Sequence, residues 1–439
     1  MKKPLPAPSP TGNLSSIKMP SREAPWLTID AQRRSVSINS NDPGFYNDPY
    51  AAYERIRAVT PAFYWEEQRV WCFLNAADVG AILRDRRFGR ELLPPHGEPA
   101  PPPKPVPAHV KAFHEVNRDS MLEREPPVHT RLRTLVNRAF VARNIERLRP
   151  RISALAHELI DRMEPSHGAE LIAAYAAPIP VVVIAELLGV PADMSPQLLD
   201  WSHRMVAMFQ LGRTRAMEDS AEAATLEFSG FLRGYFAERR KKPADDLISH
   251  LLAAEATGES LSEDEMIATC ILLLNAGHEG TVHSIGNAVK TLLEEKTHLQ
   301  AAFATEAATE ATVEECLRFD PPLHMFSRYA QEDVDVGGVK LLRGAEVALL
   351  YGAANRDPAR YPRAHVFDPT RPVQGGASAH ASFGGGIHFC LGAPLARLEL
   401  QVALPLLFER LPGIFLSERP RYRDSYHFHG LEALNVAWP

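Results

Sequence analysis

Apolar residues recur at helical spacing along most of this chain, which predicts a mainly helical protein. Residues 151–164, 215–240 and 393–411 each place apolar side chains every three or four positions, the period of one helix face. Pro150 stands where the first turn of the first of these helices is expected, a position that tolerates proline. The pattern indicates helices that bury one face against a core.

The longest helical pattern covers residues 261–294. Ser262 opens it and Glu265 follows three residues later, which is the signature of a capping box. At about 1.5 Å per residue a continuous helix here would be about 50 Å long, so we expect it to cross the whole molecule. Gly277 and Gly280 lie in its middle, where each glycine costs about 1 kcal/mol relative to alanine. A functional reason should offset that cost.

Strand patterns are few. Residues 60–74 and 332–351 carry β-branched and aromatic residues around turn signals, and a third such region lies near the C-terminus. Two other stretches, residues 92–106 and 353–392, are predicted to be irregular because they are rich in proline or glycine. The pattern as a whole predicts a mainly α fold with a small β portion.

Composition favours a globular protein without a membrane span. The net charge is -6, and 23% of the residues are charged. The longest apolar runs, Leu171–Ala185 and Ile267–Leu274, are shorter than the roughly 20 residues that a span needs. The N-terminus has no apolar stretch after its lysines, so we expect no signal peptide. We predict a disordered tail over residues 1–25 and a single domain over residues 26–439, with a helix-rich lobe and a smaller β-rich lobe.

Cysteine spacing excludes two classes of small-domain architecture. The chain contains Cys72, Cys270, Cys316 and Cys390. Their spacings match neither a zinc site nor a disulfide framework. We therefore expect a reduced, cytoplasmic protein in which three of these residues are buried thiols.

Cys390 differs from the other cysteines in its surroundings. It stands in Phe383–Gly392, FGGGIHFCLG, and a predicted helix begins directly after this loop. Backbone N–H groups at the N-terminus of a helix stabilise negative charge, so a thiolate is favoured there. Glycines let the backbone approach a flat cofactor closely. A phosphate-binding loop would need a Gly-Lys-Ser/Thr ending, which is absent.

This segment resembles the haem-binding signature of the cytochrome P450 family, Phe-Gly-x-Gly-x-His-x-Cys-x-Gly. The fixed positions are Phe383, Gly384, Gly386, His388, Cys390 and Gly392. The resemblance is to bacterial, soluble haem-thiolate monooxygenases. It implies the P450 fold, with haem b (iron protoporphyrin IX) between the long central helix and the helix after Cys390. It also implies that Cys390 is the proximal iron ligand, that Phe383 shields its thiolate, and that His388 meets a haem propionate.

Three further cations resemble the propionate partners of the family. His129 and Arg133 are four residues apart and so lie on one helical face, and Arg328 occurs in LHMFSRY. Arginine suits this role because it can bind a carboxylate bidentately. Taken without the cysteine loop, the same residues would fit a solvated basic helix face.

A second motif resembles a structural element of the family. Glu315 and Arg318 are three residues apart, so on a helix they can pair. By themselves they could form a surface ion pair that contributes little stability. The resemblance implies instead that they fix their helix to the irregular segment ahead of the haem loop, which includes Arg371.

The middle of the long helix matches the family with one departure. Ala276 to Thr281 read AGHEGT, against a family pattern of Ala/Gly-Gly-x-Asp/Glu-Thr-Thr/Ser. The resemblance implies that Ala276 and Gly277 make room beside the cofactor, where a local break in the helix would admit a water or dioxygen. It also implies that Glu279 helps deliver protons during oxygen activation.

Gly280 replaces the usual threonine of that pattern. Thr281 follows it, but lies about 100° further around the helix and need not point toward the iron. Three explanations remain open: an ordered water replaces the hydroxyl, the substrate brings its own hydroxyl, or the enzyme couples poorly and releases peroxide. We predict Glu279, Gly280 and Thr281 as the catalytic positions.

Two other classes of function share some of these residues. His278, Glu279 and His283 resemble a zinc-protease motif, but the histidines are five residues apart rather than four and so are about 140° away from a common face. A haem-binding sensor or carrier without turnover is the other class. A metal assay that finds iron rather than zinc would exclude the zinc protease, and product formation with any substrate would exclude the sensor or carrier.

The predicted function is insertion of one oxygen atom into a hydrophobic small molecule, typically as hydroxylation. Atypical chemistry, such as peroxide-driven oxidation or oxidative coupling, is the alternative because of Gly280. The resemblance places an apolar pocket on the distal side. Its predicted substrate-binding residues are Leu273, Leu323, Met325, Phe326 and Phe428.

Electrons are expected from a separate ferredoxin or flavodoxin, because the chain ends soon after the haem helix. Residues 131–151 hold seven arginines and one acidic residue, Glu146, in a net acidic protein. We interpret them as a docking patch for an acidic partner, with nucleic-acid binding as the weaker interpretation. A monomer without nucleic-acid or membrane partners is predicted.

Overall fold

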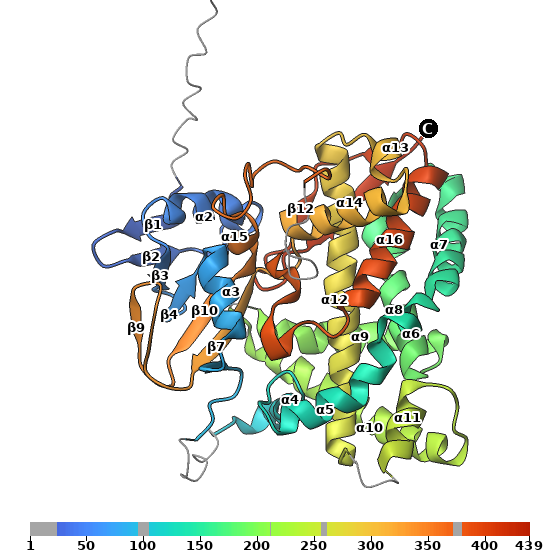
Figure 1. Cartoon of the computed structure of the whole chain (residues 1–439). Helices are drawn as coiled ribbons and strands as arrows, with labels where there is room; N and C mark the ends of the chain where they lie inside the picture. Colours follow the sequence, from blue (N-terminus) through green and yellow to red (C-terminus); the bar gives the residue numbers. More distant parts are fainter. Residues whose placement is uncertain (1–23, 95–104, 211, 256–260, 372–379) are drawn as a thin grey trace, which may run out of the picture.

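The computed structural model describes residues 24–94, 105–210, 212–255, 261–371 and 380–439 (Figure 1). The predicted tail at residues 1–25 therefore lies almost entirely outside the described residues. Part of the irregular segment 92–106 does so too, and its described flanks contain no helix.

Helices make up most of the described structure, as the periodicity predicts. The first half of the chain contains α1 (Pro43–Tyr46), α2 (Pro49–Arg57), α3 (Ala76–Arg84), α4 (Lys111–Arg118), α5 (Val128–Asn137), α6 (Ala142–Glu146), α7 (Arg149–Met163), α8 (Pro178–Leu188) and α9 (Ser195–Val206). The second half contains α10 (Arg215–Lys241), α11 (Leu247–Glu255), α12 (Glu263–Glu294), α13 (Leu299–Ala302), α14 (Glu306–Phe319), α15 (Tyr351–Asn355) and α16 (Ala393–Arg410).

The strands are short, and those of the largest sheet gather on one side of the molecule (Figure 1). They are β1 (Leu27–Asp30), β2 (Ser35–Ile38), β3 (Ala62–Trp65), β4 (Val70–Phe73), β5 (Phe88–Gly89), β6 (Gly168–Glu170), β7 (Met325–Ala330), β8 (Val334–Val336), β9 (Val339–Leu341), β10 (Glu346–Leu350), β11 (Phe415–Leu416), β12 (Arg421–Tyr422), β13 (Leu431–Ala433) and β14 (Asn435–Ala437). The predicted strand region 60–74 thus forms the hairpin of β3 and β4. Region 332–351 forms the hairpin of β8 and β9, followed by β10.

The largest sheet joins β1 to β5, from the N-terminal part of the chain, to β7 and β10. Its strand order is β1-β2-β3-β4-β10-β7-β5, and β10 pairs in parallel with β4, placing Val347 opposite Trp71. On its other side β10 pairs antiparallel with β7, placing Leu350 opposite Met325. These pairings bring the start of β7 to the edge of the helical part, where the cavity described below is found.

Helix α12 runs through the middle of the helical part (Figure 1). Its capping box is as predicted: Glu265 N–H donates to the Ser262 hydroxyl oxygen, and the Glu265 carboxylate accepts from Ser262 N–H. It packs against α8, α14 and α16. This central position explains why most of its residues are buried and why its sequence is apolar on nearly every face.

The helix is continuous through Gly277 and Gly280, so the break expected there is not present in this structure. A side chain on Gly277 would come within 3.0 Å of Ile184 on α8. Gly277 therefore allows close packing of two helices, which offsets part of its conformational cost. The described π-helical stretch lies elsewhere, at Ile172–Ala176.

The main hydrophobic core lies among the helices, and two smaller apolar clusters pack against the large sheet. The mainly α fold class with a small β portion is confirmed. The assignment of residues 26–439 to one domain stays a prediction. Within the described residues, no helix combines the length and the apolar character that crossing a membrane requires.

Candidate active site

A cavity of about 570 Å³ lies between the middle of α12 and the loop that carries Cys390. All the residues that the sequence predicts to bind the cofactor line it. They are His129, Arg133, Ala276, Gly277, Arg328, Phe383, Gly384, His388, Cys390 and Gly392. Segments far apart in the sequence therefore meet at one site, as the resemblance implies.

The backbone of the cysteine loop requires glycine at two positions. Gly384 and Gly386 have φ of +68° and +65°, in the left-handed region that favours glycine. A side chain on Gly386 would also lie 2.1 Å from the carbonyl oxygen of Leu83. Cys390 N–H donates to the Phe383 carbonyl at 2.9 Å and closes the loop. The loop is thus a tight turn that holds the thiol at the cavity wall.

Unlike the three other cysteines, Cys390 is exposed, and it lines the large cavity. Desolvation by the surrounding protein raises its pKa, and the nearby N–H groups of Gly392 and Ala393 together with Arg133 and Arg397 oppose that rise. The helix N-terminus therefore favours the thiolate, as predicted, but does not outweigh desolvation. A metal ion that binds sulfur would provide the missing stabilisation.

Two arginines, the half-buried Arg133 and the buried Arg328, face the same cavity without a carboxylate partner. Arg133 donates to the Phe389 carbonyl at 2.7 Å, and Arg328, 2% exposed, donates to the Ser327 carbonyl at 2.8 Å. Neither forms an ion pair with any described residue. Because an unpaired buried charge costs several kcal/mol, both guanidinium groups fit an anionic ligand in the cavity.

His129 adds a third unsatisfied group. Its Nε2 is buried and has no hydrogen-bond partner among the described residues. Burial, followed by the charges of His388 and Arg133, lowers the pKa of His129 to about 4, so the ring is neutral at pH 7 and has one N–H to donate. The set of Arg133, Arg328 and His129 matches the two carboxylates of a haem.

His388 contacts an acidic residue that the sequence analysis did not identify. Its Nε2 lies 2.9 Å from Glu125 Oε1, and Glu125 also accepts from Arg90 N–H. The predicted contact of His388 with a propionate stays a prediction. Arg90 lines the cavity as well. No motif marks Arg90 or Glu125, because neither belongs to a spaced signature.

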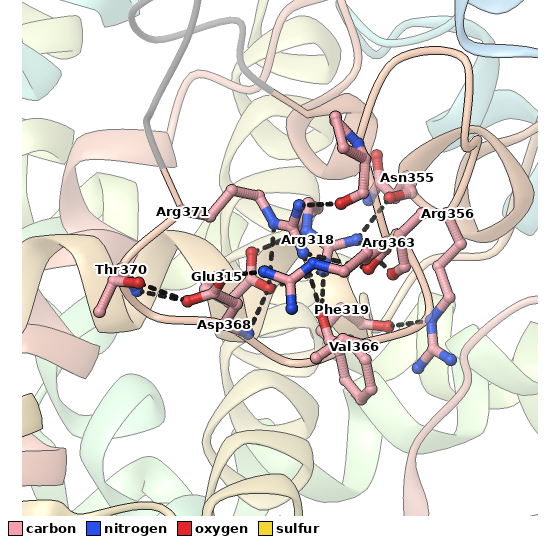
Figure 2. A network of polar contacts seen from close by, with 12 residues as sticks. Glu315, Arg318, Phe319, Asn355, Arg356, Arg363, Val366, Asp368, Thr370 and Arg371 are labelled. Atoms are coloured by element: carbon pink, nitrogen blue, oxygen red, sulfur yellow. Dashed lines mark hydrogen bonds and ion pairs between the residues drawn. The ribbon is translucent and has the colours of Figure 1, made fainter. Parts of the chain in front are cut away.

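The pair Glu315–Arg318 is buried rather than superficial (Figure 2). Arg318 donates through Nε and Nη2 to the two carboxylate oxygens of Glu315, both at 2.7 Å, and through Nη1 to the carbonyls of Asn355 and Ala364. Arg371 lies 3.4 Å from Glu315 and donates to carbonyls of the same segment. These contacts tie α14 to the segment that precedes the cysteine loop.

Glu279 lies on a different side of α12 from the residues that line the large cavity, and its role in proton delivery stays a prediction. Its carboxylate faces a separate cavity of about 270 Å³, which shares Val206 and Phe428 with the large one. Burial alone would raise the pKa of Glu279, but His278 and His283 hold it well below its usual value, so the carboxylate is ionised. Sequence spacing could not show this, because it does not fix which side of α12 faces which neighbour.

The other two predicted catalytic positions do line the large cavity. Nothing lies within 4 Å of a side chain added at Gly280, so that position is open space. Thr281 also lines the cavity, with its hydroxyl 3.5 Å from the Gly277 carbonyl, and Ser284 donates to the Gly280 carbonyl at 2.8 Å. The structure therefore brings hydroxyl groups to this wall although the usual threonine is absent.

Glu399 on α16 is a further buried acid that the sequence analysis missed. Its carboxylate forms no ion pair with a described residue, and the Thr281 hydroxyl is the one polar contact recorded for it there. Burial raises the pKa of Glu399 to about 8, against an opposing contribution from the Thr281 hydroxyl. Its position in an apolar helix face gives no sequence signal of function, since a solvated acid would look the same.

The remaining wall of the large cavity is apolar, as expected for the substrate side. The predicted residues Leu273, Leu323, Met325, Phe326 and Phe428 all line it, together with Phe113, Met205, Phe209 and His427. Two other histidines, His324 and His429, are buried in a cluster with Asp320 and are not part of the wall.

Comparison with known proteins identifies the class. The sequence model of the family described as Cytochrome P450 matches residues 96–414. The chain is 35% identical over 407 residues to a biotin biosynthesis cytochrome P450 of Bacillus subtilis (strain 168), covering 92% of this chain and 100% of that protein. It is also 35% identical to the cytochrome P450 monooxygenase PikC of Streptomyces venezuelae, covering 90% and 92%.

Solved structures agree. The crystal structure of P450BioI with an acyl carrier protein ligated to hexadec-9Z-enoic acid matches with a TM-score of 0.83 and 35% identity, covering 90% of this chain and 100% of that one. This chain therefore belongs to the cytochrome P450 family and is a haem-dependent monooxygenase. The available thiol, the unpaired cations and the apolar cavity fit that cofactor.

Proposed function

We propose that this P450 inserts one oxygen atom of dioxygen into a hydrophobic small molecule, typically as a hydroxylation, with Cys390 as the iron ligand. One observation carries the proposal: a single apolar cavity contains both the Cys390 thiol and the Gly277–Thr281 face of α12. When bound, the haem supplies the activation of dioxygen. The residues of the chain hold the cofactor, position the substrate and handle protons.

The proposal assigns the cofactor contacts to residues on three sides. Arg133, Arg328 and His129 bind the propionates, because their buried donors lack acidic partners. Phe383 shields the sulfur, and Arg397 stacks 4.5 Å above its ring, which fixes that ring. Ala276 and Gly277 leave space on the opposite side. Glu315, Arg318 and Arg371 act structurally, by holding the segment before the loop.

Proton delivery is proposed to involve α12 without the usual threonine. Glu279 holds negative charge at the smaller cavity, while Thr281 and Ser284 present hydroxyl groups to the large one. Because Gly280 leaves open space, a water or a substrate hydroxyl can occupy the position of the missing side chain. This explanation is preferred over poor coupling.

The test is reconstitution with a panel of hydrophobic compounds, a ferredoxin and its reductase, under ¹⁸O₂. Compounds that bind should shift the haem Soret band, and product should contain one ¹⁸O atom. Leu273→Asp should abolish the shift, whereas Leu342→Asp, at a residue 61% exposed, should not. If product forms only with added peroxide and never contains ¹⁸O, the alternative of peroxide-driven oxidation replaces the proposal.

An acidic ferredoxin or flavodoxin is proposed to dock on the arginine-rich helices. Of the seven arginines in residues 131–151, Arg131, Arg149 and Arg151 are paired with acids, and Arg133 faces the cavity. Arg138, Arg143 and Arg147 are exposed and form no ion pair in the described part of the chain. Helix α6 packs against α16, the helix that follows Cys390, so the patch lies on the thiolate side.

Stopped-flow reduction by a ferredoxin tests the docking patch. Arg143→Glu should slow reduction and weaken its dependence on ionic strength, because opposite charge accelerates association. Arg215→Glu, an exposed arginine of α10, is the matched control. A rate unaffected by salt in the wild type would rule the patch out. We also propose that the protein is cytoplasmic and a monomer. Light scattering of the purified protein checks the oligomeric state.

A further inference from the structure

Three histidines converge on one carboxylate beside the substrate cavity. His203 Nε2 of α9 lies 3.3 Å from Glu279 Oε1, and His278 Nε2 of α12 lies 3.5 Å from the same oxygen. His283 Nε2 lies 3.2 Å from the other oxygen, Glu279 Oε2. Glu279 is 3% exposed, so water contributes little to its solvation. The cluster opens on the smaller cavity, which His203, Glu279 and His283 line.

The hydrogen bonding of His278 determines what its free nitrogen can do. Its Nδ1 lies 2.8 Å from the Leu274 carbonyl, and since a carbonyl only accepts, Nδ1 carries the proton. In the neutral ring Nε2 then presents a lone pair to the carboxylate of Glu279. This nitrogen is fully buried, and besides Glu279 Oε1 at 3.5 Å it has no hydrogen-bonding contact with a described residue. Two lone pairs facing each other require a cation between them or a proton on Nε2.

The same arrangement is found around histidines that bind metals. A ligating imidazole usually donates its other N–H to a backbone carbonyl or carboxylate, which fixes the ring and its tautomer. His278 does so through Leu274. His283 can donate to Glu279 and thereby orient the carboxylate, as a second layer around a metal.

We propose that His203, His278 and Glu279 form a site for a divalent transition metal such as Zn²⁺. Their three ligand atoms all lie within 4.8 Å of one another. Zinc bonds of about 2.0–2.1 Å in tetrahedral geometry separate neighbouring ligands by about 3.3 Å. The two separations from Glu279 Oε1, 3.3 Å to His203 and 3.5 Å to His278, are close to this value, and the separation between the two histidine nitrogens is at most 4.8 Å. A water from the smaller cavity completes the coordination, and the site binds a metal without performing hydrolysis.

A second cluster in the molecule has similar ligands but does not qualify. Asp320, His324 and His429 are also close together. There, however, the carboxylate of Asp320 already accepts hydrogen bonds from the Tyr50 and Tyr422 hydroxyls. All three residues are buried, and none lines either cavity. The cluster around Glu279 differs because it lacks hydroxyl donors and is open on one side.

Metal binding at this site would join α9 to α12 next to the substrate wall. Met205 and Val206, two and three residues after His203 on the chain, line the large cavity. The metal would also occupy the carboxylate to which proton delivery is assigned above. Inhibition of turnover is therefore expected, and this consequence rests on the proposed function, whereas binding itself does not.

Calorimetric titration of the chelator-treated, haem-loaded protein with ZnCl₂ tests the site. The wild type should bind one ion, and His203→Ala should weaken binding at least about 10-fold, a loss of about 1.4 kcal/mol. Glu279→Gln should weaken it as well. His250→Ala, at another exposed histidine, is the matched control and should bind as the wild type does. An unchanged melting temperature shows that His203→Ala is folded.

The opposite results are equally clear. No binding by the wild type would mean that His278 is simply protonated, and the site would be rejected. Equal binding by the wild type and His203→Ala would place the ion elsewhere and overturn the assignment. Inhibition by Zn²⁺ that is lost in His203→Ala would connect the site to turnover; binding without inhibition would reject only that consequence.

Discussion

Two buried arginines in this molecule have opposite surroundings. Arg318 is 3% exposed, and its guanidinium is matched by the Glu315 carboxylate and by backbone carbonyls (Figure 2). Arg328 is 2% exposed, contacts the Ser327 carbonyl at 2.8 Å and the Tyr351 hydroxyl, and has no ion pair among the described residues. A buried charge that the chain satisfies belongs to the scaffold. A buried charge that it leaves unsatisfied indicates a ligand of opposite charge.

The largest expected effect is on the scaffold arginine. Arg318→Ala should destabilise the protein by about 3–5 kcal/mol, because Glu315 is left as an uncompensated buried charge. Denaturant unfolding of the wild type and variant measures this difference. Arg363→Ala removes an arginine 69% exposed at its side chain, which pairs with Asp368 at the surface, and should change stability by less than about 1 kcal/mol. Equal effects of the two variants would contradict the comparison.

Glu399 sharpens the comparison because it is a buried acid that pairs with no cation among the described residues. Its folded-state pKa of about 8 exceeds the ordinary value of 4.5, so the folded protein retains a proton that the unfolded chain releases. Stability should therefore fall as the pH rises from about 5 to 8, by up to about 1.4 kcal/mol per pH unit. Glu399→Gln should flatten this part of the profile. Glu409→Gln, at an exposed acid of the same helix, should leave the profile as in the wild type.

Replacing Arg328 should weaken haem binding without destabilising the haem-free protein. Arg328→Leu should weaken haem binding on the order of 10- to 100-fold, since a hydrogen bond to a charged group contributes about 1.5–3 kcal/mol. The haem-free protein should be at least as stable as the wild type, because a buried charge has been removed. Haem titration and melting of the haem-free protein separate the two effects. Loss of stability with unchanged haem affinity would make Arg328 a scaffold residue.

The smallest expected effect is at Gly280. Gly280→Thr introduces a hydroxyl into open space at the cavity wall, so the substitution should be tolerated. The ratio of product to peroxide should change by a few-fold, which a turnover assay with both readouts measures. An unchanged ratio would mean that this position has no part in proton delivery.

Much of the fold follows from local signals. The capping box of Ser262 and Glu265 marks the start of α12 to within two residues, and the predicted helices over 151–164, 215–240 and 393–411 appear as α7, α10 and α16. Short helices such as α4 were not predicted, because few residues define their period. Their positions depend on packing against distant segments, which spacing along the chain does not contain.

The candidate site could likewise be predicted from the sequence only in part. A spaced signature identified Cys390 and its loop, and the cavity contains every predicted cofactor residue. Glu279 was predicted to help deliver protons, but the sequence did not show that it faces the smaller, neighbouring cavity, because the rotation of α12 is set by its packing. Arg90, Glu125, His203 and Glu399 have no signature, and only the folded chain brings them to their partners.

The central claim is that Cys390 binds haem iron as a thiolate. The direct measurement is the visible spectrum of the reduced protein with carbon monoxide, for the wild type, Cys390→Ser and Cys316→Ser. A strongly red-shifted Soret band is predicted in the wild type and in Cys316→Ser, and its loss in Cys390→Ser. A band typical of histidine-ligated haem in the wild type, or a red-shifted band that persists in Cys390→Ser, would contradict the claim.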